Sequence, residues 1–255
     1  MKYLERIDYK HKGLLDNLYV WLRGTGDPKV ELNGYDFTRP QIIRNTSDYW
    51  LCFLQGSTEK LEGAIPRKGN VLRYVLPSRA ISSELDKTNR LLKRMVRKVN
   101  EDILERRIEN HNLNFLALST ANSIPFYLMG NYHYKPSRFV SIAPGLNIAQ
   151  VVVSSIATKK VVKKIRRAGQ NPYSVIEDAL RIFNPNNYLD YLTGETDLEV
   201  HLASFDKMVP PEQGEAFVSE LTSRGLKPRI TRHLHGHVFT VINALKHWQE
   251  ETNSR

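Results

Sequence analysis

The chain has 255 residues, of which 41% are hydrophobic, which suits one large domain or two small ones with an ordinary hydrophobic core. Its single cysteine excludes an internal disulfide, and no stretch of about 18 apolar residues occurs, so we expect no membrane span. The formal charge of +10 favours anionic partners through long-range attraction but says nothing about the fold.

Two segments, 87–98 and 158–167, concentrate the positive charge. Both place Lys and Arg between apolar residues at helical spacing, which predicts the solvated faces of amphipathic helices. The alternative is an anionic surface or nucleic acid as partner. Because no aromatic-interleaved recognition motif accompanies the charge, we do not expect nucleic acid. The first residues lack the long apolar core of a signal peptide, so we expect a cytoplasmic protein.

In chain order, the first local signal is Asn33-Gly34, a tight-turn pair. Continuous apolar runs then predict buried strands at 49–54 and 70–77. A long helix follows, with Ser82 or Ser83 as its N-cap. One apolar stripe at steps of three or four residues runs along this helix. It consists of Leu92, Met95, Val96, Val99 and Ile103.

Strands at 113–118 and 138–145 follow, with a helical segment between them. The segment 146–197 carries no clear strand signal but has two Asn-Pro helix starts, at Asn171 and Asn184.

The last predicted elements are a strand at 198–205, a helix from Pro211 that ends before Gly225, and a strand at 226–234. A final helix carries an apolar stripe formed by Val238, Val241, Ile242, Leu245 and Trp248.

This alternation of strands and helices predicts a mostly parallel sheet with helices on both faces, a three-layer α/β/α sandwich in a single domain over 1–255. In such sheets the working site lies at the carboxyl ends of the strands. If the chain is an enzyme, reactive groups should therefore follow strands directly.

Three reactive residues do follow predicted strands, in the order Ser119, Asp206 and His237. A serine hydroxyl is a poor nucleophile at neutral pH and needs a histidine to accept its proton. The histidine in turn needs a carboxylate that fixes its tautomer and stabilises its charged form.

The turn Ala117-Leu118-Ser119-Thr120-Ala121 resembles the nucleophile turn of the α/β-hydrolase superfamily, in which small residues flank the serine because the turn is strained. Alanines stand here where that family usually has glycines. The alternative is that Ser119 caps the helix that follows its strand.

The loop "SFDKMVPPEQGEAF" is similar to the family's acid loop, with Asp206, Val209 and Pro210 at the matching positions. The alternative is that Asp206 caps a helix. The resemblance assigns the histidine to His237, which follows Gly236 and precedes the final helix.

Two neighbouring histidines leave alternatives open. His235 is the rival of His237, whereas His233 is expected to belong to the last strand. The three histidines would share one face of an extended chain, which permits a metal site. No nearby Cys or Glu cluster completes one, so we expect no metal.

The resemblance also implies an oxyanion hole made of backbone N–H groups. Thr120, after the nucleophile, would supply one, and Ser57, in Gln55-Gly56-Ser57, would supply the other. Gln55 departs from the histidine that is common in that family.

Together these motifs predict a serine hydrolase that cleaves an ester, thioester or amide through an acyl-enzyme, without a cofactor. The partner would be a small acyl substrate, which the basic helix at 158–167 could attract if it is anionic. The alternative is a catalytically inactive binding or scaffold protein, motivated by Ala117, Ala121 and Gln55. The segment 146–197 is expected to roof the pocket. Its aromatic residues either line an acyl site or pack on the sheet, and they are Tyr173, Phe183, Tyr188 and Tyr191.

Overall fold

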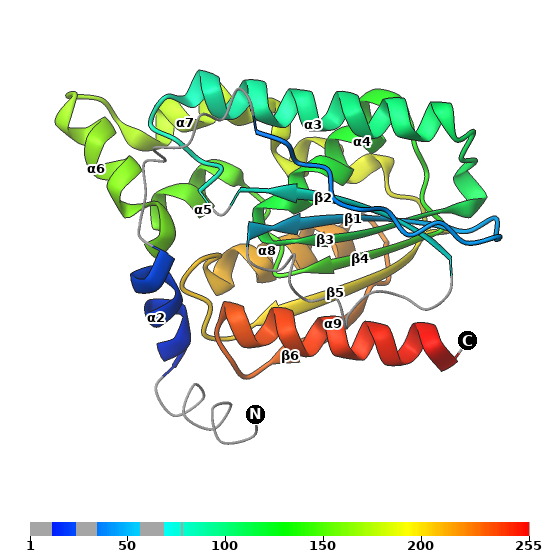
Figure 1. Ribbon diagram of the computed structural model, residues 1–255. Coiled ribbons are helices and arrows are strands. Elements are labelled where there is room, and N and C mark those ends of the chain that lie inside the picture. Colours follow the sequence, from blue (N-terminus) through cyan, green and yellow to red (C-terminus); the bar gives the residue numbers. More distant parts are fainter. Residues whose placement is uncertain (1–11, 24–34, 57–68, 78, 255) are drawn as a thin grey trace.

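The computed structural model describes residues 12–23, 35–56, 69–77 and 79–254, so the turn predicted at Asn33-Gly34 lies outside the described residues. One six-stranded sheet, in the order β2-β1-β3-β4-β5-β6, forms the centre of the molecule (Figure 1). The strands are β1 (Tyr49–Gln55), β2 (Asn70–Leu76), β3 (Leu113–Leu118), β4 (Arg138–Ile142), β5 (Asp197–Ala203) and β6 (Arg229–His233).

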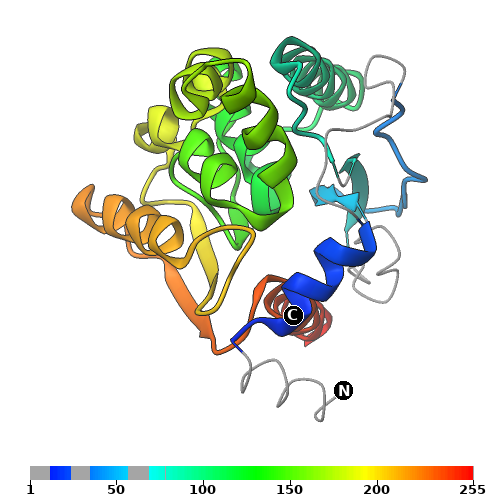
Figure 2. The same cartoon turned by 90° about the vertical axis from the view of Figure 1, so that its left-hand side faces the viewer.

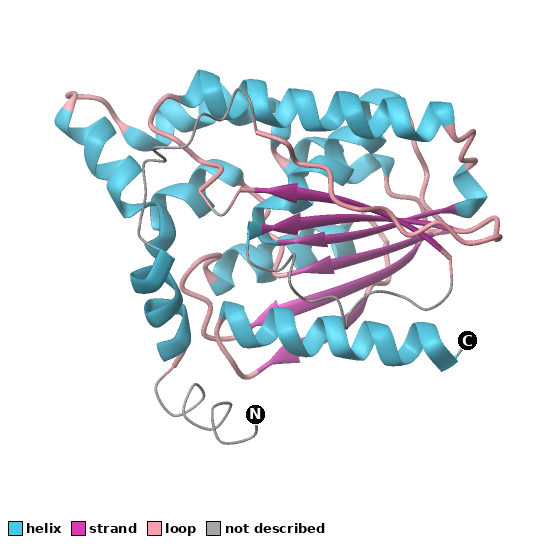
Figure 3. Cartoon of the chain, in the orientation of Figure 1, coloured by secondary structure: helices cyan, strands magenta, loops and turns pink. Residues whose placement is uncertain are grey.

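All neighbouring strands pair in parallel, so their arrowheads point to one edge of the sheet in Figure 3. Two antiparallel bridges, Thr38–Tyr74 and Ile42–Val71, attach the chain before β1 to the free side of β2. The predictions of six strands and of a mostly parallel sheet are therefore confirmed.

Helices precede, connect and follow the strands. They are α2 (Leu14–Arg23), α3 (Leu85–Glu105), α4 (Ser123–Tyr132), α5 (Ile148–Ser154), α6 (Lys159–Arg167), α7 (Pro172–Leu180), α8 (Pro211–Ser223) and α9 (His237–Ser254). Among the helices of the described residues, none combines the length and the apolarity that a bilayer crossing requires.

The two faces of the sheet bury different side chains of the same strand. In β1, Leu51 and Phe53 belong to the larger core, which α3, α4 and α8 cover. Trp50 and Cys52 belong to the core on the other face, together with residues of α9. This helix is the red one in Figure 2. This alternation follows from the two-residue period of a strand. It produces the three-layer arrangement that the sequence predicts.

The long helix α3 carries the predicted stripe, and all five of its residues are buried. Its cap was predicted wrongly. The helix begins at Leu85 with Glu84 as N-cap, and no side chain caps it. The Ser82 hydroxyl instead accepts the Glu84 N–H at 3.1 Å, which closes a turn ahead of the helix.

The two Asn-Pro starts differ in the structure. Asn171 caps α7 as predicted, because its side chain accepts the N–H groups of Tyr173 and Ser174. Asn184 precedes a short 3-10 helix but does not cap it. Its side chain instead accepts the Ile148 N–H at 2.8 Å and donates to Glu177 at 2.9 Å, which links α5 and α7.

A buried ionic network lies where β4, β5 and α9 meet. Its centre is Glu199, only 3% exposed, which accepts hydrogen bonds from Arg138 at 2.8 Å and from Arg229 at 3.0 Å. Its other carboxylate oxygen lies 2.8 Å from a ring nitrogen of His201. Burial alone would raise the pKa of Glu199, but the bonds to His201 and Arg138 lower it to about 2.

This network gives a stability prediction. Replacing Glu199 with Gln removes the buried negative charge that neutralises the guanidinium groups of Arg138 and Arg229. We expect it to lower the free energy of unfolding by about 3 kcal/mol, as is typical when one partner of a buried ion pair is lost. The loss should be measured by urea unfolding at pH 7.

The matched control is Glu215→Gln, which breaks an ion pair with Arg232 whose two side chains are about half exposed. That change should cost less than about 1 kcal/mol. Because the pKa of Glu199 is depressed from 4.5 to about 2, its stabilisation is present above pH 4.5 and is lost as the pH falls through about 2. Equal costs for the two variants at pH 7 would contradict this view of the network.

Candidate active site

Ser119 begins a short 3-10 helix, Ser119–Asn122, directly after β3. Its φ angle is +53°, in the left-handed region, and the residue is 4% exposed. A serine gains nothing locally from this conformation, which costs about 1–3 kcal/mol and persists only where the surrounding structure imposes it. The turn therefore has the strained backbone geometry that the resemblance predicts for Ser119.

Two polar residues hold the turn from beneath. The Asn122 side chain donates to the carbonyl oxygens of Ser119 at 2.8 Å and Ile142 at 3.2 Å. The Ser141 hydroxyl, on β4, donates to the Asn122 side-chain oxygen at 2.7 Å. Two of these hydrogen bonds thus tie the strained turn to β4, and the third closes the turn itself.

Two observations concern whether Ser119 lies in a nucleophile turn or caps a helix. Ala117 and Ala121, which flank the turn, are fully buried. The N-cap residues of the 3-10 helix and of α4 are Leu118 and Asn122, and neither helix has a side-chain cap. The Ser119 hydroxyl therefore does not act as a helix cap.

Asp206 and His237 are in direct contact. The ring Nδ1 of His237 lies 2.7 Å from Oδ2 of Asp206, and both residues are buried. The other oxygen of Asp206 accepts the N–H groups of Met208 and Val209, both at 2.7 Å. Since α8 begins only at Pro211, Asp206 closes the turn that precedes α8 rather than capping the helix.

The charge on Asp206 changes the proton affinity of His237. Burial alone would lower the pKa of His237, but the charge and hydrogen bond of Asp206, together with the charge of Asp16, raise it above its ordinary value of 6.5. The imidazolium form is thus stabilised, which suits a group that accepts a proton during a reaction.

The two other histidines have different partners. His233 ends β6, as predicted, and its Nε2 lies 3.0 Å from Nδ1 of His201. Burial and the nearby histidines lower the pKa of His233 to about 4. The His235 ring packs against Phe239 at 5.7 Å, and its buried Nδ1 has no hydrogen-bond partner among the residues that the structure describes. Of the two rivals, it is His237 that contacts the carboxylate.

Ser119 lies in a small pocket that it shares with the acid loop. Val209 lines this pocket beside Ser119, and the same residue donates its N–H to Asp206. Within the described residues, no hydrogen bond joins the Ser119 hydroxyl to the His237 ring.

The predicted oxyanion donors are only partly described. Thr120 follows Ser119, and its hydroxyl lies 3.3 Å from the Gln55 side-chain oxygen, which joins the turn after β3 to the end of β1. Gly56 has a φ angle of +56°, so the chain turns sharply after β1. Ser57 lies outside the described residues.

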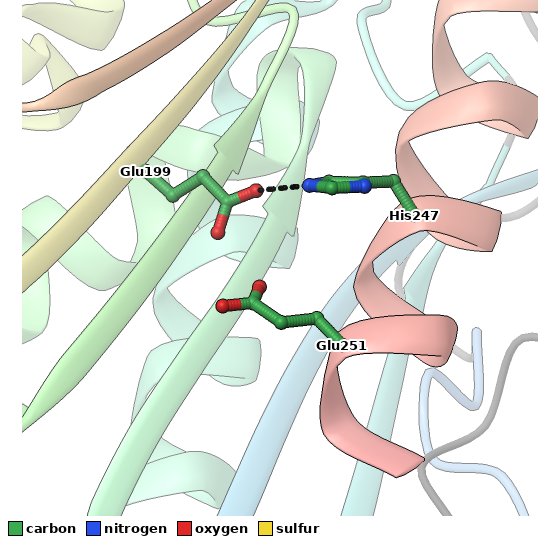
Figure 4. A group of neighbouring side chains, drawn as sticks. All are labelled: Glu199, His247 and Glu251. Carbon is green, nitrogen blue, oxygen red and sulfur yellow. Dashed lines mark ion pairs between the residues drawn. The ribbon is translucent and has the colours of Figure 1, made fainter. Parts of the chain in front are cut away.

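One cluster among the described residues has ligand atoms close enough for a metal ion. Glu199, His247 and Glu251 bring one such atom each within 4.8 Å of one another (Figure 4). However, Arg138 and Arg229 both bond to each of the two carboxylates. Two guanidinium groups thus already supply the positive charge, so the cluster is an ion-pair network.

Two of the four aromatic residues of 146–197 pack on α4. Phe183 is fully buried and stacks on Tyr127 at 4.9 Å, while Tyr188 lies against Gly130, where a Cβ atom would collide with its ring. Tyr173 and Tyr191 are about 40% exposed. None of the four lines the pocket beside Ser119.

Sequence reasoning missed three residues of the site. Asn122 and Ser141 support the turn, and Asp16, on α2, accepts the backbone N–H of His237 at 2.9 Å. Asn122 and Ser141 gave no signal because polar residues at strand and helix ends are common. Asp16 could not be found, because 221 positions separate it from His237.

No protein-family model matches the sequence, and no curated protein matches it. Solved structures do match. An acylaminoacyl peptidase from Pyrococcus horikoshii superposes with a TM-score of 0.59 and 11% identity, over 86% of this chain and 41% of that one. A puromycin-hydrolyzing peptidase from Mycobacterium tuberculosis gives a TM-score of 0.53 and 13% identity, over 80% of this chain and 33% of that one.

A thermophilic esterase from Thermogutta terrifontis gives a TM-score of 0.50 and 12% identity, over 81% of this chain and 83% of that one. The chain spans less than half the length of the two peptidases. At these identities the similarity concerns the fold, and it agrees with the six-stranded parallel sheet. The chain therefore has the α/β-hydrolase fold that its motifs predict.

Proposed function

We propose that this protein is a serine hydrolase that cleaves an ester, thioester or amide through an acyl-enzyme. One observation carries the proposal. A serine in left-handed backbone conformation ends β3 at the same edge of the sheet as a hydrogen-bonded Asp206–His237 pair. Such a turn is costly for a serine and is typical of a nucleophile.

In the proposed reaction, Ser119 Oγ bonds to the substrate carbonyl carbon while its proton passes to His237 Nε2. The leaving group departs as the bond to it breaks and takes that proton from His237. A water oxygen then bonds to the acyl carbon and gives one proton to His237. The bond between that carbon and Ser119 Oγ breaks, Oγ takes the proton back from His237, and the carboxylic acid is released. The Asp206 carboxylate accepts the Nδ1–H of His237, which leaves Nε2 free to act as the base.

The negative charge that builds on the carbonyl oxygen needs donors. We assign this role to the backbone N–H groups of Thr120 and Ser57, as the sequence motif predicts. Loss of one such donor can cost about 3 kcal/mol of transition-state stabilisation.

Two observations support the proposed substrate class. The similar structures include two peptidases and an esterase, which suggests an amide or ester bond as the target. The apolar side chains that line the pocket beside Ser119 include Ile148 and Val151 of α5 and Pro185, the first residue of the 3-10 helix Pro185–Tyr191. This supports a small apolar acyl group and a roof formed by 146–197.

The helix α6, which belongs to the segment 146–197, is positively charged. All six of its lysines and arginines are exposed, while Val161, Val162 and Ile165 are buried. In Figure 1 the helix lies beyond the edge where the strands end. We assign to it the attraction of an anionic group on the substrate.

Covalent labelling tests the nucleophile. A fluorophosphonate probe should label the wild-type protein, because it reacts with an activated serine hydroxyl. Ser119→Ala should lose the label and lower kcat on a generic ester by a factor on the order of 10⁴ to 10⁶. Mass spectrometry of the labelled peptide gives the site.

Ser123→Ala is the matched control, because Ser123 lines the same pocket but its hydroxyl donates to the Thr120 carbonyl at 2.9 Å. This variant should still be labelled. A folded wild-type protein that takes no label would favour a binding or scaffold protein. A label that persists in Ser119→Ala would show that another residue is the nucleophile.

The pH profile tests the base. His237 acts only when neutral, and its pKa lies above 6.5 because the nearby carboxylates outweigh burial. The value of kcat/KM should therefore fall on acidification, with its midpoint above pH 6.5. Asp206→Asn should lower kcat by a factor on the order of 10⁴, because the imidazole then loses its tautomer control.

A profile that stays flat between about pH 5 and 8 would remove His237 from this role. The comparison with His235→Gln separates the two histidines, since that variant should keep the acid limb of the wild-type protein.

A further inference from the structure

The N-terminal helix α2 places a buried carboxylate against the histidine loop. Asp16 is fully buried, and its Oδ2 accepts the backbone N–H of His237 at 2.9 Å. Its Oδ1 accepts the N–H of Val238 at 3.2 Å. These are the first two residues of α9, whose N–H groups have no partner within the helix.

The start of α9 lacks a cap of its own. The Gly236 carbonyl accepts the Thr240 N–H at 3.1 Å, so Gly236 occupies the capping position but has no side chain. A Cβ atom at Gly236 would lie 2.8 to 2.9 Å from the Asp16 carboxylate, which is too close. The carboxylate from α2 therefore occupies the place of the missing cap.

Asp16 also holds the acid loop. Its Oδ2 accepts the backbone N–H of Lys207 at 3.0 Å, one residue after Asp206. Beside it, Gly13 approaches the same loop so closely that a Cβ atom there would lie 2.5 Å from the Phe205 carbonyl oxygen. One carboxylate thus joins the two loops that carry Asp206 and His237.

We propose that Asp16 is a positioning residue for His237, which fixes the start of α9 against the acid loop and stabilises the charged imidazole through its own negative charge. This inference rests on the proposed function, in which His237 is the base. It adds a second carboxylate, from an element outside the sheet, to the pair that the sequence motifs predict.

The electrostatics of the site agree with this role. Among the described residues, the charged groups that act on His237 are Asp206, from the loop after β5, and Asp16, from α2, and both raise the pKa of His237. Burial and the neighbouring Asp206 raise the pKa of Asp16. The N–H groups of His237 and Lys207 oppose that rise, so they favour the charged form of Asp16.

The test is Asp16→Asn, which keeps the size of the side chain and one acceptor but removes the charge. We expect kcat on a generic ester to fall about 10- to 100-fold with KM little changed, because the imidazolium form of His237 loses stabilisation. The pKa of His237, followed by NMR of its ring proton and assigned with His237→Gln, should fall by about one unit.

Two further variants complete the experiment. Asn17→Ala changes an exposed neighbour on α2. It should leave kcat and the pKa of His237 as in the wild-type protein. Asp16→Ser is a second neutral variant, whose hydroxyl can still accept one N–H. It should lower the pKa of His237 as Asp16→Asn does.

The outcomes separate this inference from the proposed function. A folded Asp16→Asn protein with unchanged kcat and unchanged His237 pKa would overturn the positioning role. Unfolding of both Asp16 variants, with Asn17→Ala folded, would show that Asp16 is purely structural. A wild-type protein without activity would overturn the proposed function, whereas a fall in the pKa of His237 would still support the electrostatic contact.

Discussion

Parallel pairing sends every strand of the sheet toward one edge, and the arrangement of the site depends on this constraint. The residues after β3, β5 and β6 are far apart in the sequence, yet their strands lie in one sheet with β4 between β3 and β5. Since each strand begins at the opposite edge, a helix must return the chain between them. The three candidate residues therefore lie at one edge of the sheet, Ser119 directly after β3, Asp206 in the loop after β5 and His237 at the start of α9.

Each half of the proposed site has a second layer that holds it in place. Asn122 and Ser141 fix the turn at Ser119, where the backbone is strained. Asp16 fixes the start of α9, whose first residue is His237. In both cases a buried polar side chain satisfies backbone groups rather than substrate. Sites of this kind need such support, because a displacement of about 1 Å can cost much of the rate.

The fold could be predicted from sequence because its signals are local and agree with one another. Apolar runs of the right length indicated the strands, and the stripe of α3 indicated a helix packed on one side. Local signals failed where tertiary contacts competed with them. Asn184 has the sequence of a helix cap, but its side chain is used to link α5 and α7.

The candidate site could be predicted only where a motif exists. Ser119, Asp206 and His237 lie in short patterns that follow strands, and the structure joins the last two directly. Asp16 has no such pattern, because an acidic residue in the first turn of a helix is common and indicates only a favourable dipole interaction. Its partner loops lie at the other end of the sequence, so only the folded structure could identify it.

The bond between Asp16 and His237 has a consequence for how the chain folds. It closes a loop of 221 positions, and the entropy of such closure must be offset before the contact stabilises anything. During synthesis, α2 is made long before α9. The Asp16 carboxylate therefore stays hydrated until the backbone N–H of His237 is available. The strands β1 to β4 can assemble earlier, whereas the His237 imidazole reaches its position only when α9 packs against the sheet. The contact would then be a late step of folding, formed only after α9 has been synthesised and has packed against the sheet.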